Sequence, residues 1–340
     1  MQTNTKTKKP LILLIVVLLI LFFSPAILSA FVRILLELTW EKVGLFATIF
    51  LGIFIEALPF LLMGTLASGL VEVFIKPETI QRWMPKNRFL SVVFGSVLGL
   101  IFPVCECGVV PLIRRLIQKG FPVAAGVAFL LAAPVFNPIV ILSTSAAFGW
   151  GKVLALRLGL TILIAIITGL VFSTAESPVE VLRPNLRFQF NSLPSLPVAN
   201  PEGFFHTAGR VLRVALDELF EMGKFLVIGG MLAAFMQTFI PQSGMAALAK
   251  HPLLSVLVMM ALAVLLSICS TVDSFVALGF VNVFPTGAIL SFLVFGPMVD
   301  IKSTLMYTRV FRPRHVAYMI GITFLLNALA GILINYFLTG

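Results

Sequence analysis

The chain has 340 residues, of which 59% are hydrophobic and only 11% charged, and its mean hydropathy is +1.09. These values exclude a water-soluble globular domain and indicate an integral membrane protein. Lys and Arg give a net charge of +10, but they lie in short runs between apolar segments, which indicates membrane topology and not binding to nucleic acid. Strand-like alternation is absent from the sequence, so we expect an all-α protein in the lipid bilayer.

The first apolar segment begins at Leu11, directly after a basic N-terminus. It continues to Leu36 without a good site for signal cleavage, so we expect residues 1–39 to be an uncleaved transmembrane anchor with a cytoplasmic N-terminus. Three further segments reach the roughly 20 apolar residues that a helical crossing needs, namely residues 43–75, 153–172 and 316–338.

Residues 40–172 and 204–340 carry similar motifs in the same order, at an offset of about 164 residues, which predicts one module used twice. The polar, Pro-rich residues 173–203 between these halves are predicted to form a cytoplasmic linker. Apolar residues recur at helical spacing over 204–216, which predicts either an interfacial helix or a simple extension of the next span.

The distribution of Lys and Arg predicts the orientation of the halves. If the segments at Cys105 and Cys269 are re-entrant hairpins, and those at Asn137 and Asp300 are complete but broken crossings, most basic residues lie on the cytoplasmic side. The second half is then inverted, with about seven crossings and two hairpins in the chain and the broken helices meeting at the bilayer midplane. A few basic residues remain on the other side: Arg33, Lys42, Lys152, Arg157 and Lys250.

Cysteines interrupt two apolar segments. In a continuous helix Cys105 and Cys107 would point about 200° apart, but neighbouring Pro and Gly residues predict extended backbone that turns both sulfurs to one side. Together with Cys269, such thiols suit a soft, thiophilic centre. The alternative is that they are small buried residues that pack as hydrophobes.

Other residues at the breaks have the character of helix caps. Asn137 followed by Pro138, Asp300, and the pair Ser270-Thr271 are all typical of helix starts. Four half-helix starts in the membrane would converge on one point and bind an anion, a thiolate or a neutral polar solute.

Ionisable residues in these apolar surroundings are costly and therefore candidates for function. We expect Glu106 and Asp273 to carry protons and Asp300 to contact substrate. The alternative is a structural ion pair of Lys302 with Asp300 or Asp273. Glu56 and Glu221 occupy matching places in the repeat, where a structural role is expected.

The sequence contains no P-loop, no dinucleotide-binding fingerprint and no zinc-protease or hydrolase motif. We therefore expect no cofactor, no resident metal and no enzymatic activity. Transport would draw on an ion gradient, on downhill flow or on a partner ATPase that this chain does not encode.

Three stretches, residues 103–112, 128–138 and 269–275, resemble the bacterial predicted-permease family that includes ArsP, an efflux permease for trivalent organoarsenicals. The resemblance implies a multi-pass permease of the bacterial plasma membrane. Glu106 departs from the family pattern, in which a small residue usually stands between the first two cysteines. The site positions that the resemblance carries over are Cys105, Cys107, Gly108, Pro134, Asn137, Pro138, Cys269 and Asp273.

The sequence thus predicts a secondary permease that exports a small thiophilic solute by proton-coupled alternating access. Cys105, Cys107 and Cys269 would form a transient thiolate site, because thiol ligation and proton release are linked. One alternative is a carrier for an anion or a sulfur-containing metabolite that uses half-helix dipoles. Another, from a different class, is a membrane thiol oxidoreductase. The expected partners are a small soft metalloid or anion and the lipid bilayer, and the sequence leaves the oligomeric state open.

Overall fold

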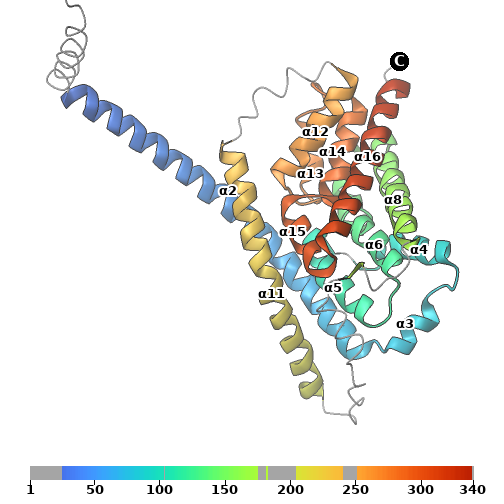
Figure 1. The fold of residues 1–340 in the computed structure, drawn as a ribbon. Coiled ribbons are helices and arrows are strands. Elements are labelled where there is room, and N and C mark those ends of the chain that lie inside the picture. Colours follow the sequence, from blue (N-terminus) through green and yellow to red (C-terminus); the bar gives the residue numbers. More distant parts are fainter. Residues whose placement is uncertain (1–24, 103, 175–180, 183–203, 240–250, 339–340) are drawn as a thin grey trace, which may run out of the picture. The chain divides into compact units, whose positions relative to one another are not determined.

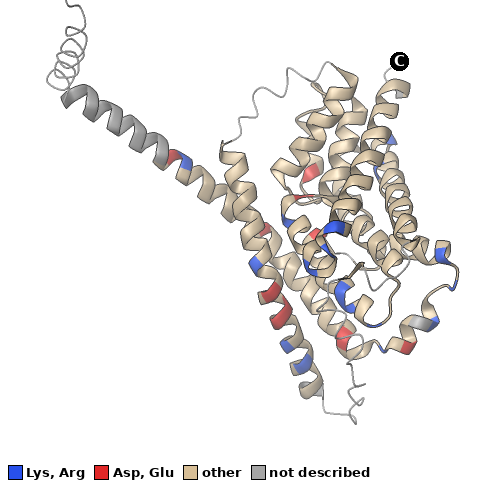
Figure 2. Ribbon diagram, in the orientation of Figure 1, with Lys and Arg blue, Asp and Glu red and all other residues tan. Residues whose placement is uncertain are grey.

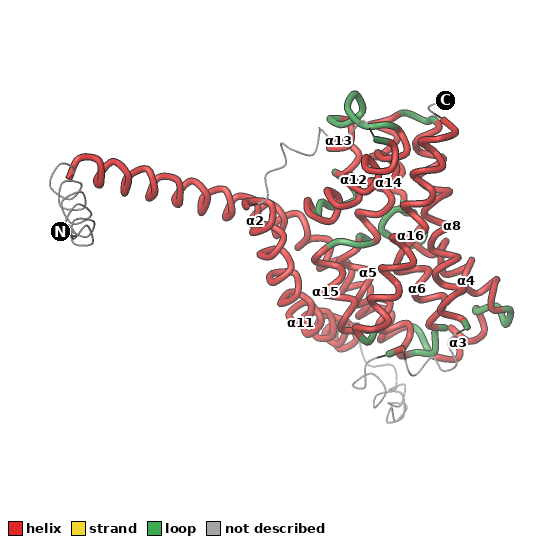
Figure 3. Tube along the Cα trace, turned by 45° about the horizontal axis from the view of Figure 1, so that its top comes forward, coloured by secondary structure: helices red, strands yellow, loops and turns green. Residues whose placement is uncertain are grey.

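The computed structural model describes residues 25–102, 104–174, 181–182, 204–239 and 251–338 (Figure 1). Within these ranges the chain is helical and has no β-strand, and loops occur only at breaks and turns (Figure 3). The α-helices in chain order are α2 (Pro25–Phe74), α3 (Pro77–Trp83), α4 (Arg88–Val97), α5 (Glu106–Gln118), α6 (Val123–Ala132), α7 (Pro138–Phe148), α8 (Lys152–Ser173), α11 (Phe204–Phe239), α12 (Pro252–Leu266), α13 (Asp273–Leu278), α14 (Thr286–Met298), α15 (Ile301–Val310) and α16 (Pro313–Leu338).

Residues 1–48 and 49–340 form two separate compact units. The first unit contains the predicted anchor, whose residues 1–24 lie outside the described part of the chain, and residues 25–48 are helical. The second unit contains the rest of α2 and all the other helices.

Four described helices are long and apolar enough to cross a membrane, and the predicted spans at 43–75, 153–172 and 316–338 are confirmed as helices of this kind. The fourth is residues 206–239, and α14 with α15 makes a fifth if this pair, bent by 40° at a short break, counts as one span. The expectation of about seven crossings also counted residues 11–32, most of which lie outside the described part of the chain, and a broken crossing at Asn137, so the described helices do not test it. Helices α4, α6, α7 and α12 are apolar but only 10–17 residues long, and each is too short for a full crossing by itself.

The predicted linker lies between two helices: α8 ends at its first residue, Ser173, and α11 begins directly after it, at Phe204. Helix α11 runs without interruption to Phe239, so residues 204–216 extend the following span and do not form a separate interfacial helix. Within the predicted linker, Val181 and Leu182 are buried, and the Arg312 backbone N–H donates to the Val181 carbonyl at 3.0 Å. This part of the linker therefore packs against the start of α16.

Each half contributes a layer of three packed helices. Helix α6 packs against both α4 and α8, and α14 packs against both α12 and α16; α4 also contacts α8, and α12 contacts α16 (Figure 1). The two central helices are apolar on every side, and a helix of this composition is stable only when its neighbours bury it. The shorter helices pair across the halves, α5 with α15 and α7 with α13. This common order of packing supports the predicted repeat, whereas the inversion of the second half stays a prediction.

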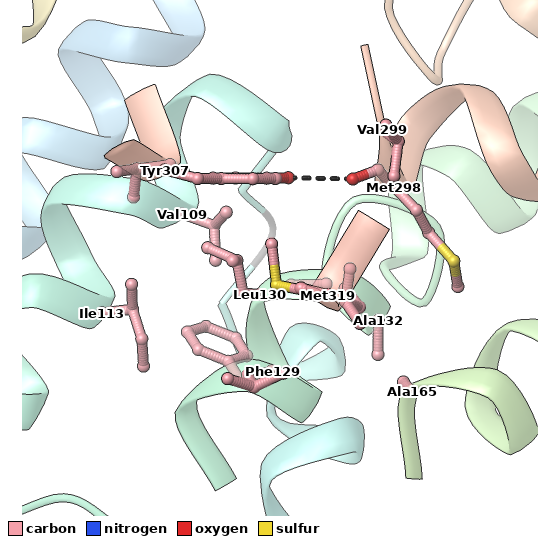
Figure 4. Packing of buried hydrophobic residues seen from close by; sticks show 14 of the residues in the cluster. Val109, Ile113, Phe129, Leu130, Ala132, Ala165, Met298, Val299, Tyr307 and Met319 are labelled. Atoms are coloured by element: carbon pink, nitrogen blue, oxygen red, sulfur yellow. Dashed lines mark hydrogen bonds between the residues drawn. The ribbon is translucent and has the colours of Figure 1, made fainter. Parts of the chain in front are cut away.

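The core between the layers is continuous and takes side chains from both halves. Figure 4 shows Phe129 and Leu130 of α6 in the same cluster as Met319 of α16. The hydroxyl of the fully buried Tyr307 donates to the Met298 carbonyl at 3.1 Å. That carbonyl lies at the end of α14, where the helix supplies no backbone donor, so Tyr307 satisfies a group freed by the break before α15.

Candidate functional site

Two half-helices begin side by side in the middle of the second unit. Cys105 precedes α5 and Asp300 precedes α15, and both have extended backbone. The Lys302 ammonium lies 3.4 Å from Asp300 Oδ2 and 3.7 Å from Glu106 Oε1. All three charged side chains are at most 2% exposed. The ionisable residues at these breaks therefore form one buried cluster in which Lys302 lies between two carboxylates.

The three cysteines lie in the same region and are free and buried. All three cysteines belong to one buried cluster, in which Cys105 lies near both Cys107 and Cys269. Cys105 has the predicted extended backbone, but Cys107 already belongs to α5, so the extended segment covers one of the two cysteines. Among the residues that the structure describes, no group of three or more His, Cys, Asp or Glu has the arrangement of a metal-ion site.

Asp300 is held by several donors. Its Oδ1 accepts from the Ser303 backbone N–H at 2.6 Å, and Ser303 Oγ accepts from the Asp300 backbone N–H, so the two residues form a capping box. Its Oδ2 accepts from the Ser267 hydroxyl at 2.9 Å. The prediction that Asp300 caps a helix is confirmed, and its carboxylate is well satisfied as an anion.

Glu106 has a different environment. One of its oxygens faces Lys302, and the other, Oε2, is buried without a hydrogen-bond partner. The hydroxyl of Ser270, in the loop next to Cys269, is likewise buried and unpartnered. An unsatisfied buried polar atom costs about 1–3 kcal/mol, so these two atoms are candidates for binding a proton or a solute.

The break before α7 contains Pro134, Asn137 and Pro138. Asn137 Oδ1 accepts from the Val140 backbone N–H at 3.0 Å, and its amide donates to the carbonyls of Ala133 and Pro134. The predicted cap at Asn137, with Pro138 in the first helical position, is confirmed. The hydrogen bonds of Asn137 stay within its own break.

The predicted cap at Ser270-Thr271 is wrong. Helix α13 begins at Asp273, and the preceding Val272 provides no side-chain cap. The six residues of α13 include Ser274, whose hydroxyl lies 3.1 Å from Thr144 Oγ1 of α7. The structure thus pairs the start of α5 with that of α15, and the start of α13 contacts α7 at Thr144, whereas the convergence of all four helix starts on one point stays a prediction.

Asp273 lies beside a residue that the sequence analysis missed. Arg157 Nη2 donates to Asp273 Oδ2 at 2.6 Å, and the Arg157 side chain is completely buried. The distribution of basic residues predicted Arg157 only as one of the few on the non-cytoplasmic side, and it gave no sign of this buried ion pair. Lys302 therefore pairs with Asp300 and Glu106, and the alternative in which it pairs with Asp273 is wrong.

Gly108 has a packing role. Its backbone contacts Gly64 of α2, and a Cβ added at Gly108 would lie 2.9 Å from the Phe60 carbonyl oxygen. Glycine at both positions lets α2 pass close to the first turn of α5, next to Cys107. The contact gives Gly108 a reason to be glycine that does not depend on a substrate.

An ion-pair network holds the far ends of the same two half-helices. Glu221 of α11 accepts from Arg114 of α5 at 2.6 Å and from Arg309 of α15 at 2.9 Å. Arg115 donates to Glu218 at 2.5 Å. Figure 2 shows both acidic and basic positions along α11. The structural role expected of Glu221 agrees with these contacts.

Comparison with known proteins places these observations in context. Residues 42–336 match a family described as "predicted permease". The chain is 44% identical over 275 residues to UPF0718 protein YcgR of Bacillus subtilis, covering 80% of this chain and 91% of that protein. It is 37% identical over 277 residues to a protein of Streptococcus mutans named "putative two-component membrane permease complex subunit", covering 80% and 89%. UPF0718 protein YraQ of Escherichia coli is 25% identical over 118 residues, 34% of each chain. No solved structure matches the chain.

Proposed function

The chain belongs to the predicted-permease family, and from this premise we propose that it is a secondary permease that exports a small thiophilic solute such as a trivalent organoarsenical. The observation that carries the proposal is the cluster of three thiols with Glu106 and Lys302 where two broken helices begin. Thiolates are the protein ligands that soft centres prefer. A cluster of this kind inside apolar helices is costly to maintain, which favours a role in transport.

The chemistry of binding can be written for methylarsenite. Two thiols displace two hydroxides, so that two As–S bonds form, two As–O bonds break and two waters leave. No electrons are transferred, and each thiol proton ends in a water molecule. Glu106 is suited to move these protons, because its Oε2 is free to accept one from a thiol and to pass it to the departing hydroxide.

The other charged groups have fixed partners. Asp300 accepts from Ser267 and Ser303, and its carboxylate lies beside the Lys302 ammonium. Asp273 was expected to share the proton-carrying role, but its pairing with Arg157 leaves Glu106 as the better proton carrier in this proposal.

The test is transport of methylarsenite into everted membrane vesicles. Replacing all three cysteines with Ser should abolish uptake, and Glu106→Gln should slow it and flatten its dependence on pH. Ser255→Ala, a buried polar residue of α12, is a matched control and should transport normally. Unchanged uptake by the cysteine-free protein would disprove the thiolate mechanism.

A second candidate is a carrier for an anion or a sulfur-containing metabolite. The buried ammonium of Lys302 favours it, because an incoming anion could replace Glu106 as the partner of Lys302. This carrier would work without cysteines but not in the Lys302→Met variant. The same vesicles, loaded with labelled oxyanions or thiol compounds, distinguish the two candidates.

The Streptococcus mutans relative is named as one subunit of a two-component permease complex. We propose that this chain likewise associates with a second membrane protein. Purification from native membranes in mild detergent, followed by mass spectrometry, tests this. The proposal would be contradicted if the chain is recovered alone and the molar mass of the purified complex equals that of the chain plus its bound detergent.

A further inference from the structure

The loop that carries Cys269 is anchored at both ends by buried polar contacts. At its start the hydroxyl of Ser267 donates to Asp300 Oδ2, and Ser267 itself has a left-handed φ of 48°. At its end Asp273 accepts from Arg157. Cys269 therefore lies between an anchor on α15 and an anchor on α8.

Arg157 connects three helices. Its Nη1 donates to Thr144 of α7 at 2.8 Å and to Ser274 of α13 at 2.7 Å, while Nη2 donates to Asp273. The planar fork of a guanidinium can reach these acceptors together, which the single ammonium of Lys cannot do in the same geometry. Burying a guanidinium costs several kcal/mol unless it is paired, and Arg157 Nε is left without a partner. A buried guanidinium with an unpartnered nitrogen is destabilising, so we expect it to have a function.

The backbone between Asp273 and Cys269 links Arg157 to the Cys269 thiol. The N–H groups of Val272 and Asp273 donate to the Cys269 carbonyl at 3.0 and 3.1 Å. These two bonds make a tight turn, so a shift of Asp273 moves Cys269 with it. Cys269 and Cys105 of the other half belong to the same buried cluster and lie near one another. The contact between thiols of the two halves thus depends on where Arg157 holds Asp273.

We propose that Arg157 is a positioning residue that, through Asp273, holds the Cys269 thiol against Cys105 and so completes a dithiol site for a soft metalloid across the two halves of the chain. The inference rests on the proposed thiol site and adds to it a residue outside the thiol cluster. Arg157 does not touch the solute. It sets the geometry of one of the solute's ligands, as outer partners do for metal ligands.

The experiment uses phenylarsine oxide as the probe, because it joins two neighbouring thiols and releases one water. Full-length protein in detergent is prepared in two backgrounds. Cys107→Ser retains the pair Cys105 and Cys269, whereas Cys269→Ser retains the pair Cys105 and Cys107. Binding is measured by competition with a soluble dithiol and by intact mass, so that transport is not needed for the readout.

Arg157→Met together with Asp273→Asn removes both charges, which avoids leaving a lone buried ion. In the background with Cys105 and Cys269 this change should weaken binding of phenylarsine oxide by about tenfold or more. In the background with Cys105 and Cys107 binding should be unchanged, which also shows that the protein is folded. Arg157→Lys should give an intermediate loss in the first background.

Equal binding with and without Arg157 in the first background would overturn the inference. An equal loss in both backgrounds would do so too, because it would show a general structural effect. If binding follows Arg157 as expected but vesicles do not transport methylarsenite, the positioning role stands and the proposed function fails.

Discussion

Replacing Lys302 with Met tests the charge balance of the site. Its ammonium lies 3.4 Å from Asp300 and 3.7 Å from Glu106. With an effective dielectric constant of about 20, these distances correspond to gross attractions of about 5 and about 4.5 kcal/mol. Most of this attraction offsets the free energy needed to bury the three ions. The loss of stability in Lys302→Met therefore comes mainly from the two buried carboxylates that no longer face a cation. We expect the free energy of unfolding to fall by about 3–5 kcal/mol in Lys302→Met.

A second change identifies which carboxylate causes the loss. Asp300 keeps Ser267 and Ser303 when Lys302 is removed, whereas Oε2 of Glu106 has no hydrogen-bond partner even when Lys302 is present. Adding Glu106→Gln to Lys302→Met should therefore restore more than half of the lost free energy, and Glu106→Gln alone should cost less than about 1 kcal/mol.

The assay is denaturant titration of the detergent-solubilised protein, followed by circular dichroism. Lys224→Met on the exposed face of α11 makes the same change of side chain outside the cluster and should stay within about 0.5 kcal/mol of the unmodified protein. The reasoning is refuted if Lys302→Met is as stable as this control, or if Glu106→Gln restores nothing.

Two further predictions concern packing and the ion-pair network. Gly108→Ala should lower the free energy of unfolding by about 1–3 kcal/mol, because its Cβ would lie 2.9 Å from the Phe60 carbonyl oxygen. The control is Gly159→Ala, whose Cβ meets no atom within 4 Å and which should be neutral or stabilising. Thermal melting compares the two variants, and equal melting temperatures would contradict the packing role of Gly108. Glu221→Gln weakens the links to two arginines that are partly exposed, so we expect a loss of about 1–2 kcal/mol, with the exposed Asp217→Asn as control. A double-mutant cycle with Arg114→Met measures the first link, and a coupling energy of zero would show that the contact contributes nothing.

Local sequence signals predicted much of the candidate site. Asn137 and Asp300 cap helices as expected, because a cap depends on hydrogen bonds between residues three positions apart. Backbone at Cys105 is extended, as the nearby Pro and Gly residues indicated. The cap expected at Ser270-Thr271 failed because a short polar run has several possible helix starts, and the Arg157 contact fixes α13 at Asp273.

Hydropathy by itself determined that this is an α-helical membrane protein with breaks at its cysteines, because apolar length and the Pro and Gly positions are local properties of the chain. Only the tertiary structure decided the charge pairs. Lys302 pairs with Glu106 as well as with its close neighbour in sequence, Asp300, and the buried Arg157 pairs with Asp273. The pairs Lys302–Glu106 and Arg157–Asp273 join residues far apart in the sequence, so they form only when the halves pack. A buried ion is stabilised by its nearest neighbours in space, and the order of residues does not specify those neighbours.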